Sequence, residues 1–95
     1  MIIFKEDFRN VDTYLSLRDQ VGWIKLDRNQ AQKALDNSLA VITVFDGDKA
    51  VGMGRIVGDQ SVISYIQDLI IIPEYQGKSI GSQLLNRLIA IVDDM

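Results

Sequence analysis

Apolar residues return every three or four positions in three stretches of the chain, the spacing of one face of an α-helix. The first stretch follows Asn10 or Asp12, either of which can cap a helix, and Gly22 is placed to close it. The second follows Asp27, with Gln30 as a capping-box partner. The third helix starts at Ile80, and its apolar face holds Leu84, Leu85, Leu88, Ile89, Ile91 and Val92.

Between and before these helices the apolar residues are β-branched or aromatic, which is typical of strands. We expect a short edge strand over residues 2–5 and three longer strands over residues 39–45, about 50–57 and 61–72. Asp46-Gly47 predicts a tight hairpin, because glycine tolerates positive φ. Gly52 and Gly54 would weaken the second long strand unless other atoms pack closely over them.

The predicted order is therefore β-α-α-β-β-β-α, an α+β fold in which helices flank a mainly antiparallel sheet. No repeat, low-complexity tract or linker divides the 95 residues. We expect one domain over residues 1–95. Hydrophobic residues make up 47% of the chain, which is enough to form a packed core.

Composition removes several kinds of function. The formal net charge of -3 gives no general attraction to nucleic acid or to an anionic membrane, so any anion site must be local. The chain has no cysteine and no histidine, which excludes disulfides, thiolate or imidazole zinc sites and a Ser-His-Asp triad. No apolar run approaches the length of about 20 residues that spans a bilayer. We expect a cytoplasmic protein that binds neither nucleic acid nor membrane.

The most informative segment joins the last strand to the last helix. A Pro-marked turn at Pro73 leads into a loop of small residues, 76–81, directly before the helix. Backbone N–H groups at the start of a helix have no partner within the helix, and the helix dipole adds partial positive charge there. Such a loop favours a phosphate or pyrophosphate. An ordinary strand-to-helix turn is the alternative interpretation.

These residues resemble the GCN5-related N-acetyltransferase (GNAT) family. The core motif of that family is Gln or Arg, two variable residues, Gly, one variable residue, then Gly or Ala, and Gln76, Ser79 and Gly81 stand at its marked positions. The preceding residues 69–75 look like the fourth strand of the family and its Pro-containing turn, and the Asp46-Gly47 hairpin falls where the family joins its second and third strands.

The resemblance implies acetyl-CoA as cofactor and an N-acetyltransferase that transfers acetyl to a primary amine, on a small molecule or a peptide. It implies that backbone groups around Leu69, Ile70 and Ile71 pair with the pantetheine arm. It implies pyrophosphate contacts from Gln76, Gly77, Lys78, Ser79, Ile80, Gly81 and Ser82, with a strand N–H near Leu69 stabilising the developing oxyanion.

The sequence departs from the family in two places. Ser79 replaces the usual Gly, which costs little at negative φ but imposes strain of roughly 1 kcal/mol at positive φ. The chain stops at Met95, whereas the family continues with further strands and a fourth helix. The domain is therefore expected to lack the C-terminal strands and helix, and with them one wall of the cofactor cleft. Whether these 95 residues catalyse the reaction by themselves is an open question at this point.

Other residues keep two interpretations each. Asp68 is a candidate to assist deprotonation of the amine, or it forms a salt bridge within a hairpin; Arg55 would neutralise such an acid across the sheet. Tyr65 and Gln67 line an acceptor cleft, or Tyr65 fills a strand face. Trp23 is a core residue, which we favour, or part of a substrate lid. A rival function is a non-catalytic module whose open strand edge mediates dimerisation or peptide binding, and a third is a fragment without activity.

Overall fold

The computed structural model describes all residues from 1 to 95 and has the predicted α+β order. It consists of β1 (Ile2–Glu6), α1 (Val11–Gln20), α2 (Arg28–Asp36), β2 (Ala40–Asp46), β3 (Lys49–Gly58), β4 (Ser64–Ile71), the single 3-10 turn η1 (Pro73–Tyr75) and α3 (Ile80–Asp93). None of the helices combines the length and the apolar character that crossing a membrane requires.

The four strands form one antiparallel sheet in the order β1-β2-β3-β4. The hairpin between β2 and β3 is confirmed: Asp46 pairs with Lys49, and Gly47 takes φ +61° in the turn. The last strand starts later than predicted, at Ser64 instead of residue 61. The Asp59 carboxylate explains the difference, because it accepts hydrogen bonds from three successive amides, 61–63, and turns the chain there.

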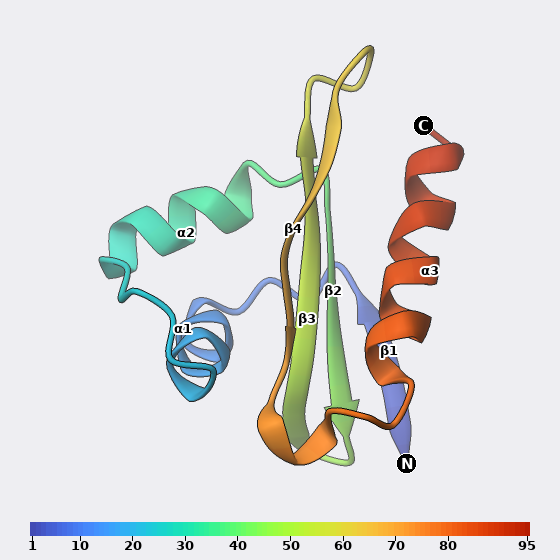
Figure 1. The fold of residues 1–95 in the computed structure, drawn as a ribbon. Helices are drawn as coiled ribbons and strands as arrows, with labels where there is room; N and C mark the ends of the chain where they lie inside the picture. The colour runs from blue at the N-terminus through green and yellow to red at the C-terminus, as the bar shows by residue number, and fades with distance from the viewer.

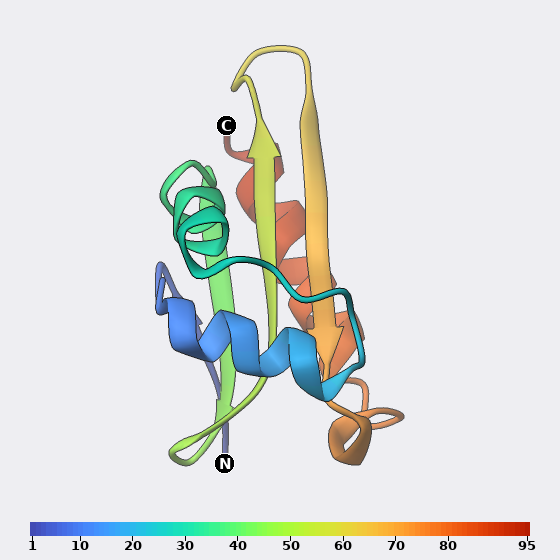
Figure 2. The ribbon, with the colours of Figure 1, turned by 90° about the vertical axis from the view of Figure 1, so that its left-hand side faces the viewer.

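Helices cover both faces of the sheet, α1 and α2 on one side and α3 on the other (Figures 1 and 2). The central strands are therefore buried on both faces, which explains the unbroken apolar run in β2. The core combines residues of all three helices with residues of β2, β3 and β4 and the residue that follows β4: Val11, Tyr14, Leu17, Ala31, Leu35, Val41, Ile42, Val44, Val51, Met53, Ile56, Ile70, Ile72, Ile80, Leu84 and Leu88.

The predicted N-caps are present, although the Gln30 side chain does not return the bond to Asp27 that a capping box would have. The Asn10 side chain accepts from the Thr13 amide at 2.9 Å, and Asp27 accepts from the Gln30 amide at 3.3 Å. The first helix ends at Gln20, and Gly22 follows with φ +73°. Each cap satisfies an amide that the helix itself leaves without a partner.

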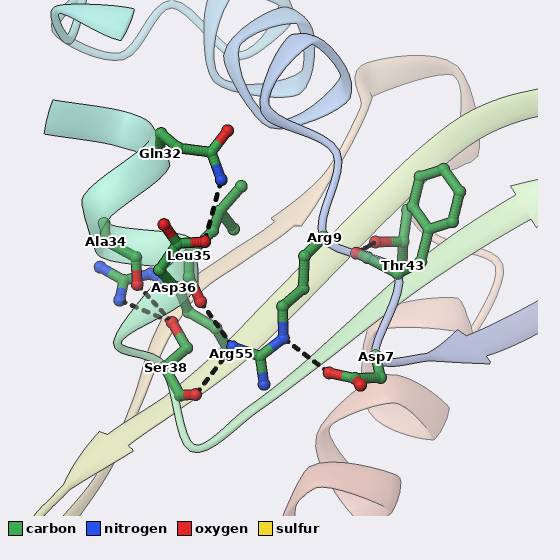
Figure 3. Close-up of polar contacts among 10 residues, drawn as sticks. Asp7, Arg9, Gln32, Ala34, Leu35, Asp36, Ser38, Thr43 and Arg55 are labelled. Carbon is green, nitrogen blue, oxygen red and sulfur yellow. Dashed lines mark hydrogen bonds and ion pairs between the residues drawn. The ribbon is translucent and has the colours of Figure 1, made fainter. Parts of the chain in front are cut away.

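Arg9 ties the segment before α1 to the end of α2 (Figure 3). Its guanidinium donates to the carbonyls of Leu35 and Ser38 at 2.6 and 2.9 Å and pairs with the Asp7 carboxylate at 2.6 Å. The cation satisfies carbonyls at the C-terminal end of a helix, where the partial negative charge of the helix dipole also attracts it. This contact fixes α2 against the sheet.

Gly52 and Gly54 lie where β3 is packed most tightly. A Cβ on Gly52 would come within 2.6 Å of the Ile70 carbonyl oxygen, and a Cβ on Gly54 within 2.6 Å of Leu88 Cδ1 on α3. The close packing expected over these glycines is thus confirmed, and it holds α3 directly against the strand.

Candidate functional site: an open strand edge and a free helix N-terminus

The edge strand β4 presents backbone groups to solvent. The Ile72 amide donates to Val51 of β3 at 2.9 Å, so alternate residues before it, Ile71 and Leu69, direct their N–H and C=O groups away from the sheet. Ile70 lies between them, 1% exposed, with its side chain in the core. Leu69 and Ile71 are therefore the two residues through which this edge can pair with a ligand.

The loop after β4 leaves a continuous run of amides without partners. The Gln76 amide donates to the Pro73 carbonyl at 3.2 Å, and the first amide bonded within α3 is that of Gln83, to Ser79 at 3.1 Å. The six N–H groups from Gly77 to Ser82 donate to no protein acceptor. They stand at the N-terminus of a helix of 14 residues, whose dipole favours an anion.

Gln76 was expected among the pyrophosphate contacts, but its backbone amide is not free. Its own amide is used by the turn, and its side-chain amide Nε2 donates to the Ile71 carbonyl at 2.9 Å. The side chain therefore bridges the edge strand and the loop. It holds in place the carbonyl that faces the open edge, and the free amides begin one residue later, at Gly77.

The side chains of the loop leave space in front of these amides. Ile80 turns into the core, with 5% exposure. A Cβ on Gly81 would have only Ile71 Cγ1 nearby, at 3.6 Å, so Gly or Ala fits there. The Lys78 ammonium lies 5.5 Å from the centre of the Tyr75 ring and forms no salt bridge.

Ser79 adopts the left-handed conformation, with φ +66° and ψ 6°. Gly77 also has positive φ, +77°, which glycine adopts without strain. Of the two alternatives for Ser79, the structure has the strained one, and the side chain makes no capping hydrogen bond that would offset the strain. The loop therefore holds a serine in a backbone conformation that favours glycine.

An open groove of about 410 Å³ runs from the edge strand to the loop. Its lining is mostly apolar and comprises Val21, Trp23, Leu69, Ile70, Ile71, Gln76 and Gly81. The prediction that Trp23 is a core residue is wrong, because the side chain is 38% exposed. Trp23 forms the wall of the groove that faces β4, because the segment between α1 and α2 crosses in front of that strand (Figure 2).

Trp23 also lines a second cavity of about 420 Å³. The other lining residues come from α1 and from the connection to α2: Leu15, Ser16, Arg18, Asp19, Lys25 and Leu26. Tyr65, which was expected to fill a strand face, is instead 56% exposed on β4, and Gln67 is exposed as well. Exposed polar groups therefore accompany the groove along the same strand.

Asp68 occupies the centre of a buried polar cluster. Its Oδ2 accepts hydrogen bonds from the Tyr14 hydroxyl and from Arg55 Nε, the latter at 2.6 Å, and its Oδ1 pairs with Arg18 Nη1 at 3.1 Å. The carboxylate is 10% exposed. The salt bridge with Arg55 across the hairpin, one of the two interpretations of Asp68, is thus present.

Burial raises the pKa of the Tyr14 hydroxyl, and the hydrogen bond to Asp68 raises that pKa further. The contribution of Tyr14 and Arg18 was missed from the sequence, because Tyr14 also fits the apolar spacing of the first helix. Their spacing of four residues, which puts both on one face of α1, is the signal that was available.

An edge strand that leads into a helix with free N-terminal amides defines a class of α+β protein with a candidate anion site beside the strand. Comparison with known proteins agrees with this class. The family model described as "Acetyltransferase (GNAT) family" matches residues 3–95. The chain therefore belongs to the acetyltransferase (GNAT) family, and the resemblance seen in the sequence is confirmed.

Individual relatives show the extent of the match. A Prochlorococcus marinus protein described as an uncharacterized N-acetyltransferase, ycf52-like, is 33% identical over 82 residues, which cover 82% of this chain and 46% of the relative. A Staphylococcus aureus structure, described as a probable acetyltransferase, has 30% identity and a TM-score of 0.92, and the match covers 99% of this chain and 71% of that one.

A GNAT family protein from Streptococcus pneumoniae has 35% identity and a TM-score of 0.84, with coverage of 95% and 67%. The predicted fold class is thereby confirmed. The chain spans about half the length of the curated relatives it matches.

Proposed function

We propose that residues 1–95 form a single domain that binds acetyl-CoA, in a protein that transfers the acetyl group to a primary amine. The observation that carries the proposal is the run of six free amides from Gly77 to Ser82 at the start of α3. Main-chain N–H groups at a helix N-terminus match the charge and geometry of a pyrophosphate. The adjacent groove has the apolar lining and open strand edge that suit an extended amide-bearing arm.

The chemistry follows from the same arrangement. When bound, acetyl-CoA would supply an acetyl thioester whose carbonyl carbon a neutral amine can attack. The C–N bond would form as the C–S bond breaks, and the CoA thiolate would leave and take up the proton that the amine loses. The N–H of Leu69 points to the open edge, where it can donate to the carbonyl oxygen as negative charge develops. Small molecules and peptides with a primary amine are the proposed acceptors.

A titration with CoA and with acetyl-CoA, followed by backbone amide shifts, tests this proposal. We expect changes concentrated in residues 69–82, because the free amides and the open edge lie there. Gly81→Asp should abolish the response, since the carboxylate would stand where the anion binds while remaining favourable for the helix itself.

Gln83→Asp is the matched control. It adds the same charge to the first turn, but two positions further on, about 200° around the helix. We expect this variant to respond like the wild type. Unchanged shifts of the wild-type chain at millimolar ligand would contradict the proposed function.

The rival function, pairing with a second copy or with a peptide by strand addition, is favoured by one observation. β4 is an edge strand, and apolar side chains along and next to it are exposed: Val62 by 86%, Ile63 by 44%, Tyr65 by 56% and Leu69 by 39%. An edge of this kind is a template for another strand.

A further inference from the structure

The strand β4 carries a bulge directly before the part of the edge proposed to face the cofactor. The pairing of β3 with β4 shifts between Met53–Ile70 and Arg55–Gln67, so that Asp68 and Leu69 together face Gly54. Asp68 has φ +54°, a left-handed conformation that is costly for most residues and better tolerated by Asp. Something in the structure must therefore hold this residue in place.

Three donors from two elements converge on the Asp68 carboxylate. Tyr14 and Arg18 reach it from α1, and Arg55 reaches it from β3. Arg55 is itself fixed, because its Nη1 donates to Ser38 Oγ at 3.2 Å (Figure 3). Three acceptor positions of the carboxylate are thus occupied, which makes Asp68 a poor choice for a group that collects a proton from the amine.

The same cluster reaches the opposite wall of the groove. Arg18 Nη2 donates to the Ile24 carbonyl at 3.0 Å, and the guanidinium lies 5.2 Å from the centre of the Trp23 ring. A single ion pair, Arg18 with Asp68, therefore connects the bulge in β4 with the segment that carries Trp23.

We propose that Asp68 is a positioning residue: its carboxylate, anchored by Tyr14, Arg18 and Arg55, fixes the bulge and thereby aims the Leu69 N–H into the groove. This inference rests on the proposed function. In this proposal Asp68 does not take part in proton transfer. It acts only by fixing the position of the Leu69 N–H.

Asp68→Asn tests the inference, because it keeps the side-chain shape and tolerates positive φ but removes the charge that holds both guanidinium groups. We expect the variant to fold and to retain acetyl-CoA-dependent shifts at Gly77–Ser82. The response of the Leu69 amide should be lost, and the affinity for acetyl-CoA should fall about tenfold. Tyr14→Phe removes one of the anchors and should give an intermediate loss.

Asp59→Ala is the control for general damage. It deletes three amide contacts at the other end of the same strand and leaves the bulge untouched. We expect a less stable protein with a normal Leu69 response. If Asp68→Asn does not fold, Tyr14→Phe decides the matter by the same Leu69 signal.

The outcomes separate this inference from the proposed function. No response at Gly77–Ser82 in the wild type would overturn the binding proposal itself. A normal response at Gly77–Ser82 in the wild type, together with an unchanged Leu69 response in Asp68→Asn and Tyr14→Phe, would overturn the positioning role alone. In the ligand-free protein, movement of the Leu69 amide signal in Tyr14→Phe, whose substitution lies 54 positions from Asp68 in the chain, but not in Asp59→Ala supports the role independently of binding.

Discussion

At the scale of single residues, Ser79 is the position where the chain departs from its family and bears a cost for it. Serine at φ +66° is strained, and no capping hydrogen bond compensates. We expect Ser79→Gly to raise the free energy of unfolding by about 0.5–1 kcal/mol, the relief of strain less the greater freedom of glycine in the unfolded chain. Urea denaturation with an unchanged slope measures the gain.

Gly77→Ala is the reverse experiment. Its φ of +77° is equally unsuited to a side chain, and no atom lies within 4 Å of the Cβ position. We therefore expect a loss of about 1 kcal/mol that reflects backbone strain alone. A Ser79→Gly variant less stable than the wild type would show that the serine hydroxyl contributes more than the conformation costs.

At the scale of elements, the amides before α3 are useful only if the helix is held firmly against the sheet. Leu88 is fully buried, and its Cδ1 lies over Gly54 of β3. We expect Leu88→Ala to lower the free energy of unfolding by about 2–5 kcal/mol through the lost contacts and the cavity left behind. Chemical denaturation of the ligand-free protein measures this loss.

Ile89→Ala, one position further along the same helix, provides the comparison. Its side chain is 41% exposed, so the expected change is about 0.5 kcal/mol. Equal effects at the two positions would mean that α3 does not depend on its contact with β3.

At the scale of the whole molecule, the unpaired edge of β4 predicts association. We expect the mass of the ligand-free chain, measured by sedimentation, to rise with protein concentration, because the exposed edge can pair with a second copy. Acetyl-CoA should favour the monomer, since it is proposed to occupy the same edge at Leu69 and Ile71. Tyr65→Lys should weaken association by adding charge beside the edge while leaving the cofactor contacts intact. A concentration-independent mass would contradict self-association through this edge.

The sequence was sufficient for the order of the elements, because each has a clear hydrophobic period and most have a cap or turn residue at the boundary. It failed at the start of β4, where Val62 and Ile63 extend the apolar pattern although the Asp59 carboxylate turns the chain there. Trp23 was misplaced because size and hydrophobicity favour the core, whereas a groove wall is a property of the assembled fold.

In the candidate site, too, some features could be predicted from local sequence, and others depend on the assembled fold. The free amides follow from the position of a small-residue loop before a helix, which is local information. The cluster around Asp68 joins residues that are 54 positions apart in the case of Tyr14, and the sign of φ at Ser79 depends on how the loop closes. Neither is visible in a spacing pattern.

The use of main-chain donors between Gly77 and Ser82 has a consequence for how such a protein changes over generations. A substitution can remove a side chain but cannot delete a peptide N–H, except by introducing proline. A site built from such donors therefore tolerates changes of residue type as long as the loop keeps its path. Only bulk and backbone freedom at a few positions, such as Gly77 and Gly81, then restrict the residue types that the loop can accept.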